Sequence, residues 1–208
     1  MRTPAAGCLA LLTLLVAGCG GSGSTAATNT ASPSAGAPAP ALKLAMRHID
    51  RDAGFQIDFP ESWKPEAPSD PKVQFLVGPK QEDAGNHDFA QVRVVAPLPA
   101  TFGPGDLQAM KKVSDALLSS QTVSIAQEEQ VTLAGRPGYQ YIYTFKDGAT
   151  GQVVAHVHEF IFDGNRLISL VFQAQPESTL RGLLATFLAM RDSFKVIPVA
   201  TANPTARP

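Results

Sequence analysis

The sequence has few cysteines, and none in the part of the chain that is long enough to fold. Cys8 and Cys19 are the only two among 208 residues, and both lie in the N-terminal segment. The rest of the chain therefore has no thiol for a disulfide, a metal thiolate or a nucleophile. This excludes a cysteine-dependent enzyme, whereas a domain of this length can be stable without disulfides.

The sequence also lacks a strong charge of either sign and the common catalytic motifs. Its formal net charge is -1 at pH 7, so no nucleic acid partner is expected. It contains no Gly-x-Ser-x-Gly sequence, and Gly103-Pro104-Gly105 lacks the rest of the phosphate-binding patterns. We therefore expect no catalytic residues and no cofactor.

Apolar runs long enough to cross a membrane are missing too. The run from Cys8 to Ala17 follows the positively charged start Met1-Arg2-Thr3 and ends at Gly18. It is shorter than the roughly 20 residues that a spanning helix needs, but it has the length of the apolar region of a signal peptide. Residues 1–18 are predicted to be a lipoprotein signal peptide.

Cys19 is the predicted lipidation site. Val16-Ala17-Gly18-Cys19 resembles the bacterial lipobox, whose cysteine receives diacylglycerol before cleavage. Residues 20–41 contain only small, polar and proline residues, which cannot bury enough surface to fold. We therefore expect a lipidated cysteine and flexible tether over residues 19–41, which hold the protein on the extracytoplasmic side of the cell membrane through lipid on Cys19.

Beyond the tether, the chain has the pattern of one globular domain over residues 42–198, followed by a disordered tail from 199 to 208. Short runs rich in β-branched and aromatic residues, separated by Gly, Pro, Asn and Asp, predict strands. The predicted strands are 55–59, 73–77, 89–95, 123–133, 139–145, 153–162 and 166–172. Gly135-Arg136-Pro137-Gly138, Asp147-Gly148 and Asp163-Gly164-Asn165 are the predicted turns between the later strands.

Two amphipathic helices complete the predicted domain. Apolar residues spaced three and four apart indicate a helix over 106–118 with Asp106 as its N-cap. A second stripe, from Leu180 to Leu188, indicates a final helix capped by Ser178. This order of elements is typical of an α+β domain in which helices cover an antiparallel sheet.

Four segments, taken in order, resemble the PsbP-like family, which includes LpqN-type bacterial lipoproteins. They are GFQIDFPESW (54–63), LAGRPGY (133–139), FIFDGNRLISL (160–170) and DSFKV (192–196). The resemblance implies an α/β/α sandwich built on an antiparallel sheet, and a role in binding or in the cell envelope. It implies no shared catalytic residues. The lipobox sets this chain apart from photosynthetic members, so no photosystem role is inferred.

His156 and His158 are the strongest candidate for chemistry. Residues two apart on a strand face the same side, so both imidazoles can meet one metal ion, with His87 or Asp88 as a third ligand. Because zinc sites usually have three or four ligands, the competing interpretation is a pair of solvated polar positions. This gives the alternative function, a metal-binding protein or metal-dependent enzyme.

The preferred hypothesis is a non-catalytic binding or assembly domain of unknown ligand. Tyr139, Tyr141, Tyr143 and Phe145 share one strand face, where they either fill the core or line a groove for a glycan or peptide. Core packing is the favoured interpretation for these rings and for Trp63. The expected partners are the membrane and an envelope protein or glycan.

Overall fold

Three stretches of the chain, residues 39–80, 87–119 and 122–199, are described by the computed structural model. The strands are β1 (Leu44–Asp50), β2 (Phe55–Pro60), β3 (Trp63–Pro65), β4 (Val73–Pro79), β5 (Phe89–Val95), β6 (Ser124–Leu133), β7 (Arg136–Lys146), β8 (Val153–Asp163), β9 (Arg166–Ala174) and β10 (Lys195–Val196). The helices are α1 (Leu107–Ser119), the 3₁₀ turn η1 (Glu177–Thr179) and α2 (Leu180–Ser193).

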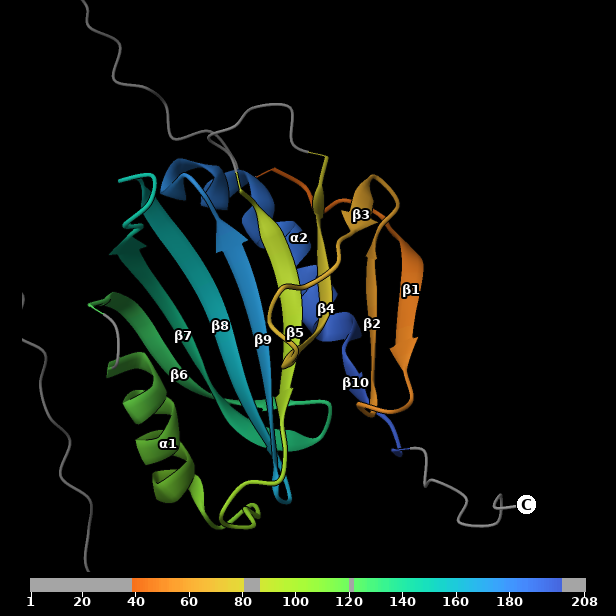
Figure 1. Cartoon of the computed structure of the whole chain (residues 1–208), viewed down its shortest axis with the longest axis vertical. Helices are drawn as coiled ribbons and strands as arrows, with labels where there is room; N and C mark the ends of the chain where they lie inside the picture. Colours follow the sequence, from red (N-terminus) through yellow and green to blue (C-terminus); the bar gives the residue numbers. More distant parts are fainter. Residues whose placement is uncertain (1–38, 81–86, 120–121, 200–208) are drawn as a thin grey trace, which may run out of the picture. The chain divides into compact units, whose positions relative to one another are not determined.

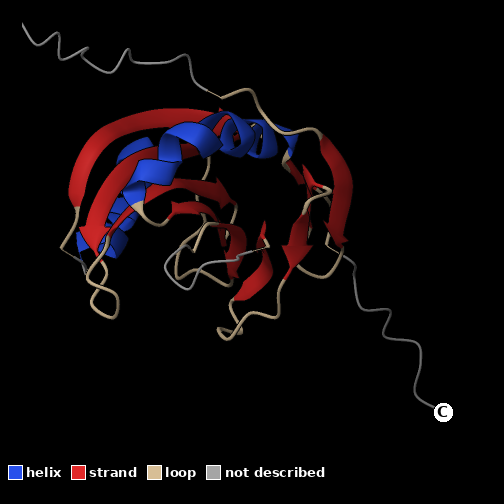
Figure 2. Ribbon diagram, turned by 90° about the horizontal axis from the view of Figure 1, so that it is seen from above, coloured by secondary structure: helices blue, strands red, loops and turns tan. Residues whose placement is uncertain are grey.

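A seven-stranded antiparallel sheet forms the centre of the domain. Its strand order is β3-β4-β5-β9-β8-β7-β6, so β9 and β8 are central while β6 and the short β3 form the two edges. The β8 and β9 strands pair in register from Ala155 opposite Ala174 to Asp163 opposite Arg166. Figure 2, which views the domain from above, shows the strands arranged along an arc.

Strand alternation gives this sheet two covered faces. On β8, Val157 and Ile161 belong to the core cluster that includes Phe187 and Met190 of α2. Phe160 and Phe162, one position out of phase, belong to a second cluster with Met110 of α1. Figure 1 shows α1 in front of the sheet and α2 behind it. The predicted α+β class, with an α/β/α arrangement, is therefore confirmed.

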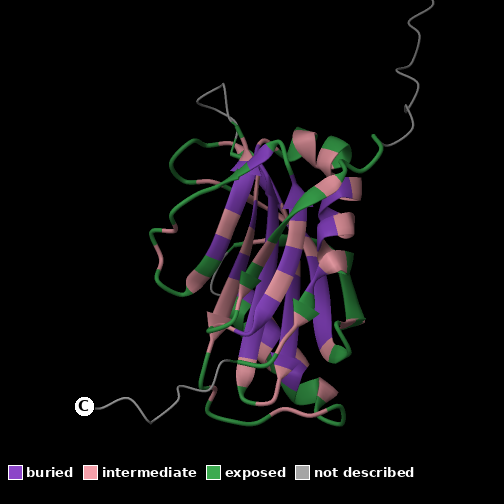
Figure 3. Cartoon of the chain, turned by 90° about the vertical axis from the view of Figure 1, so that its right-hand side faces the viewer, coloured by how far each residue is buried: buried purple, intermediate pink, exposed green. Residues whose placement is uncertain are grey.

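The α2 side holds the larger core. Phe55, Ile57, Val77, Val92 and Leu170 are buried there, each with at most 1% of its surface exposed. Burying side chains of this size stabilises a fold by about 1.5–3 kcal/mol each. Figure 3 shows buried residues concentrated along the strands, whereas exposed residues lie mainly in the loops.

A second, three-stranded sheet joins the two ends of the domain. β2 lies between β1 and β10, and both pairings are antiparallel. The backbone N–H of Leu42 also donates to Thr186 Oγ1 on α2 at 3.0 Å. The start of the predicted domain is thus attached to its last helix.

Most predicted elements are present, but several details of the prediction are wrong. Strands β1, β3 and β10 were not predicted. The turn between β6 and β7 is Ala134-Gly135, both with positive φ, while Arg136 to Gly138 already belong to β7. Ser178 lies within η1, and the residue that precedes α2 is Thr179.

The two remaining turns and the first helix follow the prediction more closely. Gly164, with a φ of 63°, and Asn165 connect β8 to β9, because Asp163 pairs with Arg166. Asp147-Gly148 begins a longer loop that extends to Gln152, whose carbonyl accepts a hydrogen bond from Asp147 N. Asp106 directly precedes α1, and its carbonyl accepts a hydrogen bond from Met110 N.

The membrane-related predictions fall outside this description. Cys19, most of the tether and residues 200–208 are not among the residues described. Within 39–80, 87–119 and 122–199, no helix is both long and apolar enough to cross a membrane.

Candidate functional site

The structure brings the two predicted histidines together. Both lie on the α1 side of β8, and Tyr143 Oη on β7 is 2.8 Å from His156 Nδ1 and 3.1 Å from His158 Nδ1. The other ring nitrogens are also engaged. His156 Nε2 lies 2.8 Å from Gln173 Oε1, and His158 Nε2 contacts Ser169 Oγ.

The hydrogen-bond partners determine which nitrogen of each imidazole carries the proton. Gln173 Nε2 donates to the carbonyl of His87 at 2.8 Å, which leaves its Oε1 to accept from His156 Nε2. Neutral His156 then accepts the Tyr143 proton at Nδ1. In turn, His158 Nδ1 donates to Tyr143 Oη, and His158 Nε2 accepts from the Ser169 hydroxyl. Every ring nitrogen has a partner with both imidazoles neutral.

The environment keeps the two histidines uncharged. Burial lowers the pKa of His156 to about 4, and burial also lowers the pKa of His158 well below its ordinary value. Burial raises the pKa of the Tyr143 phenol. The network is therefore neutral across the physiological pH range and forms a polar part of the core.

No third ligand joins the histidines in the described part of the chain. The His87 ring packs against Phe89 with ring centroids 5.3 Å apart, while Asp88 Oδ1 accepts from Gln175 N and Thr179 Oγ1. No group of three or more His, Cys, Asp or Glu placed to hold a metal ion is found there. Metal binding by His156 and His158 stays a prediction, since a metal would first have to break the hydrogen bonds described above.

The aromatic residues occupy the core, as predicted. Tyr139, Tyr141 and Tyr143 are each at most 7% exposed, and the Tyr141 hydroxyl donates to Asp115 of α1 at 2.7 Å. Trp63 is 2% exposed and meets Phe187 of α2 edge-to-face, with ring centroids 6.1 Å apart.

Sequence reasoning missed the residue with the least satisfied environment, Glu159. Its side chain lies on the α2 side of β8, in phase with the apolar residues Val157 and Ile161. It is fully buried, and neither carboxylate oxygen has a hydrogen-bond partner. An unpaired buried carboxyl group is costly, so such positions often have a function. A charged residue at a core-facing position of an alternating strand was the available signal.

The nearest cation does not satisfy Glu159. Arg191 Nη1 on α2 is 3.8 Å from Glu159 Oε1, which is too long for a hydrogen bond. That nitrogen donates instead to Gln140 Oε1 at 3.0 Å, and the other guanidinium nitrogens donate to Asp192 Oδ1. The arginine is therefore held beside Glu159 by other acceptors.

Burial raises the pKa of Glu159 to about 7; Arg191 opposes the shift, whereas the charges of Asp192 and Glu129 add to it. The side chain consequently titrates near neutral pH. A titratable group in a cleft with a strongly shifted pKa is a candidate functional group.

Glu159 lines a cavity of about 300 Å³ between the C-terminal end of α2 and strand β6. Arg191 and Asp192 form the helix side of this cavity, and five consecutive residues, Glu129 to Leu133, form the strand side. With Glu159 ionised, three carboxylates face one guanidinium. The arrangement offers hydrogen-bond acceptors and negative charge, and it lacks a donor for Glu159.

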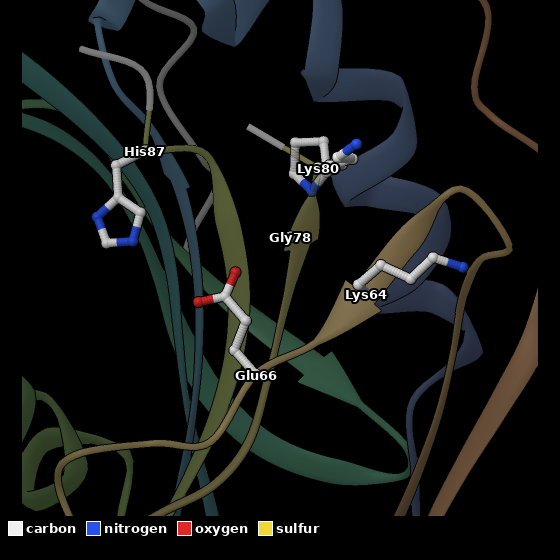
Figure 4. A pocket seen from close by; sticks show the side chains of 6 residues that line it. Lys64, Glu66, Gly78, Lys80 and His87 are labelled. Atoms are coloured by element: carbon white, nitrogen blue, oxygen red, sulfur yellow. The ribbon is translucent and has the colours of Figure 1, made fainter. Parts of the chain in front are cut away.

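A second cavity, of about 400 Å³, is less developed as a site. Figure 4 shows the Glu66 carboxylate pointing toward the space near Gly78 and His87, whereas the Lys64 amino group points away. Lys64, Glu66, Lys80 and His87 are all exposed. Since exposed charges are well solvated, this cavity has no buried group that requires a ligand.

Comparison with known proteins gives a likeness of fold. No family model matches the chain, and no curated protein matches it. Among solved structures, cyanobacterial PsbP (CyanoP) of Synechocystis sp. PCC 6803 has a TM-score of 0.49 and 17% identity, with 73% of this chain and 91% of that chain covered.

Two further structures are similar at the same level. A Bacteroides thetaiotaomicron VPI-5482 protein has a TM-score of 0.52 and 12% identity, with 76% of this chain but only 50% of that chain covered. LpqN of Mycobacterium tuberculosis, a protein involved in cell envelope biogenesis, has a TM-score of 0.46 and 12% identity. The match covers 69% of this chain and 83% of LpqN. PsbP and LpqN, the two kinds of protein that the sequence resembles, are thus among the structures that this chain is similar to, and identities this low say nothing further about function.

Proposed function

We propose that this chain is a lipid-anchored, non-catalytic binding module whose Glu159 cavity binds a cationic group of its partner. The observation that carries this proposal is the buried carboxylate of Glu159, which lines a cavity without a hydrogen-bond donor for either oxygen. An ammonium or guanidinium group supplies hydrogen-bond donors for the Glu159 oxygens and a charge that compensates the carboxylate. Asp192 and Glu129, at the border of the cavity, attract the same charge.

The lining of the cavity supports binding rather than chemistry. A carboxyl group with a pKa near 7 suits a general acid, but catalysis needs a second group placed beside it. The described lining residues include no serine, cysteine or histidine, and the cavity's other carboxylates, Asp192 and Glu129, are exposed. Glu159 therefore acts as a proton-linked acceptor for a ligand.

Anchoring is supported by the sequence around Cys19. Lipid on this cysteine places the domain at the extracytoplasmic surface of the membrane, and the residues between Cys19 and Leu42 let it reach a partner in the cell envelope. The partner is a protein or glycan that carries an exposed amine.

The direct test measures binding of n-butylammonium to the purified full chain by NMR titration at several pH values. Binding requires ionised Glu159, so the affinity should fall by up to about tenfold per pH unit below 7. Glu159→Gln should abolish this binding. Glu177→Gln, which removes the same charge at an exposed position, serves as the matched control.

n-Butanol tests whether the charge is required, because it keeps the alkyl chain without the ammonium group. Equal NMR chemical-shift changes with n-butanol and n-butylammonium would refute a cation site at Glu159. Butylammonium binding that persists in Glu159→Gln would also refute it.

A further inference from the structure

We infer that the outer edge of β6 binds an extended peptide segment of a partner, in which apolar and basic side chains alternate. This surface shares Glu129 with the cavity beside Glu159 but does not include Glu159 itself. A strand added beside β6 lies three strand spacings of about 4.8 Å from β8, which is further than one side chain extends. The inference therefore goes beyond the proposed function and stands or falls separately.

The first observation is the length and exposure of this edge. β6 has ten residues, Ser124–Leu133, and pairs only with β7 among the strands that the structure describes. Seven consecutive residues, from Ser124 to Gln130, are exposed. An edge strand presents unpaired N–H and C=O groups, which is the chemistry that recognises another extended backbone. The opposite edge, β3, has three residues and ends in Pro65, so it offers no comparable surface.

The second observation is an apolar recess on the α1 side of the edge. A cavity of about 380 Å³ lies between α1 and β6, and Leu118, Val123 and the 50% exposed Ile125 form its apolar part. The rest of its lining is polar or charged, namely Lys111, Asp115, Ser119 and Glu128. Lys111 of α1 contacts Glu128 of β6 at 2.8 Å and closes one end of the recess. Apolar side chains of an added strand would pack here beside Ile125.

The third observation is the charge on the α2 side of the edge. Glu129 lies opposite Gln140 on β7, and Gln140 lies opposite Glu159 on β8, so these three residues face the same side. Glu129 is exposed and forms no ion pair with a described cation. Because alternate residues of a strand point to opposite faces, a peptide that places apolar residues toward α1 places basic residues toward Glu129.

The same charges disfavour a second copy of this chain as the occupant. Glu128 and Glu129 lie at the centre of β6, so an antiparallel two-fold pairing of two β6 strands brings four carboxylates together. Like charges directly opposite each other destabilise a strand pair. A basic peptide removes this repulsion.

The probe for the experiment is a blocked ten-residue peptide of alternating valine and lysine, added to the purified full chain. Binding is followed by the fluorescence anisotropy of a dye attached to the peptide. Backbone pairing is followed by hydrogen exchange of the Ser124–Leu133 amides. We expect slower exchange in this segment, and at least about tenfold weaker binding when lysine is replaced by glutamate in the peptide.

Two controls separate strand pairing from charge attraction. A peptide with N-methyl groups at alternate residues keeps its charge but loses the backbone donors, and it should not bind. Ile125→Gln removes the apolar side chain from the recess without changing its charge and should weaken binding about tenfold. Ile125→Val, which keeps an apolar β-branched side chain at the same exposed site, should bind nearly as well as the natural chain.

Each contrary result overturns the inference. Equal binding of the N-methylated peptide would show attraction without strand pairing. Protection of β6 that rises with protein concentration in the absence of peptide would assign the edge to a second copy. Absence of any protection would show that the edge stays unpaired. Butylammonium binding at Glu159 is measured on the same variants and shows whether the proposed function survives.

Discussion

At the residue scale, Glu159 has the environment that departs furthest from what its side chain requires. Burial raises its pKa to about 7 from an ordinary value of 4.5, so the folded state binds its proton more tightly than the unfolded state does. The free energy of unfolding therefore decreases as the pH rises from 4.5 to 7, and Glu159 contributes most to stability in its protonated form.

Glu159→Gln should remove this pH dependence. A neutral amide cannot titrate, so the free energy of unfolding should change less between pH 5 and 8 than in the natural chain. The difference should approach roughly 3 kcal/mol, which corresponds to the size of the pKa shift. Urea unfolding at several pH values provides the measurement. An unchanged pH profile would mean that Glu159 is already ionised at pH 5.

The candidate site could be predicted only in part from the sequence. The spacing of His156 and His158 correctly placed both on one strand face, where they meet at Tyr143. The proton network depended on Gln173 and Ser169 of β9, whose proximity follows from strand pairing rather than from a local pattern. Glu159 was missed because recognising a buried charge requires knowing that both faces of β8 are covered.

At the scale of elements, Gly138 and Gly182 differ in whether the surrounding structure requires a glycine. A Cβ built on Gly138 of β7 would lie 2.1 Å from the carbonyl oxygen of Phe160 on β8, whereas one built on Gly182 of α2 meets no atom within 4 Å. The first position requires glycine for close approach of two strands. The second does not, and glycine inside a helix is unfavourable.

Gly138→Ala should therefore destabilise the domain and Gly182→Ala should stabilise it, the latter by about 0.5–1 kcal/mol. Thermal unfolding of the two variants gives opposite shifts in Tm if this reasoning is correct. A lower Tm for Gly182→Ala would contradict the prediction that this position has room for a side chain.

The strands and helices differ in how far the sequence predicted them. β2, β4, β5, β7, β8 and β9 combine alternation with clear turn residues, and all were predicted. β1 was missed because most of its side chains are exposed, so the segment Leu44–Asp50 shows no apolar alternation. The start of α2 was misplaced because Ser178, a favoured capping residue, lies inside a 3₁₀ turn that precedes the helix.

At the scale of the whole molecule, the proposed membrane attachment depends on one atom, the sulfur of Cys19. Cys19→Ala should abolish incorporation of an alkyne-labelled palmitate and release the protein from the membrane fraction, because no described helix spans a bilayer. Cys8→Ala, within the predicted signal peptide, should keep the label. Palmitate incorporation into Cys19→Ala would contradict the predicted lipidation site.

The fold class was predicted from the order of elements, and the architecture follows from it. Strands, a helix, a run of hairpins and a final helix lead to an antiparallel sheet with a helix on each face. The position of β5 beside β9 was not predictable, since Phe89–Val95 and Arg166–Ala174 are far apart in the sequence and carry no local signal for pairing.

The three-stranded sheet has a consequence for the timing of folding during export. β2 lies near the start of the domain, yet Phe55 pairs with Val196 of β10 near its end. A chain that crosses a membrane N-terminus first therefore cannot complete this sheet until its last residues have emerged. Non-local pairing of this kind delays folding, so if the chain is exported as proposed, this sheet closes only after the C-terminal strand has arrived.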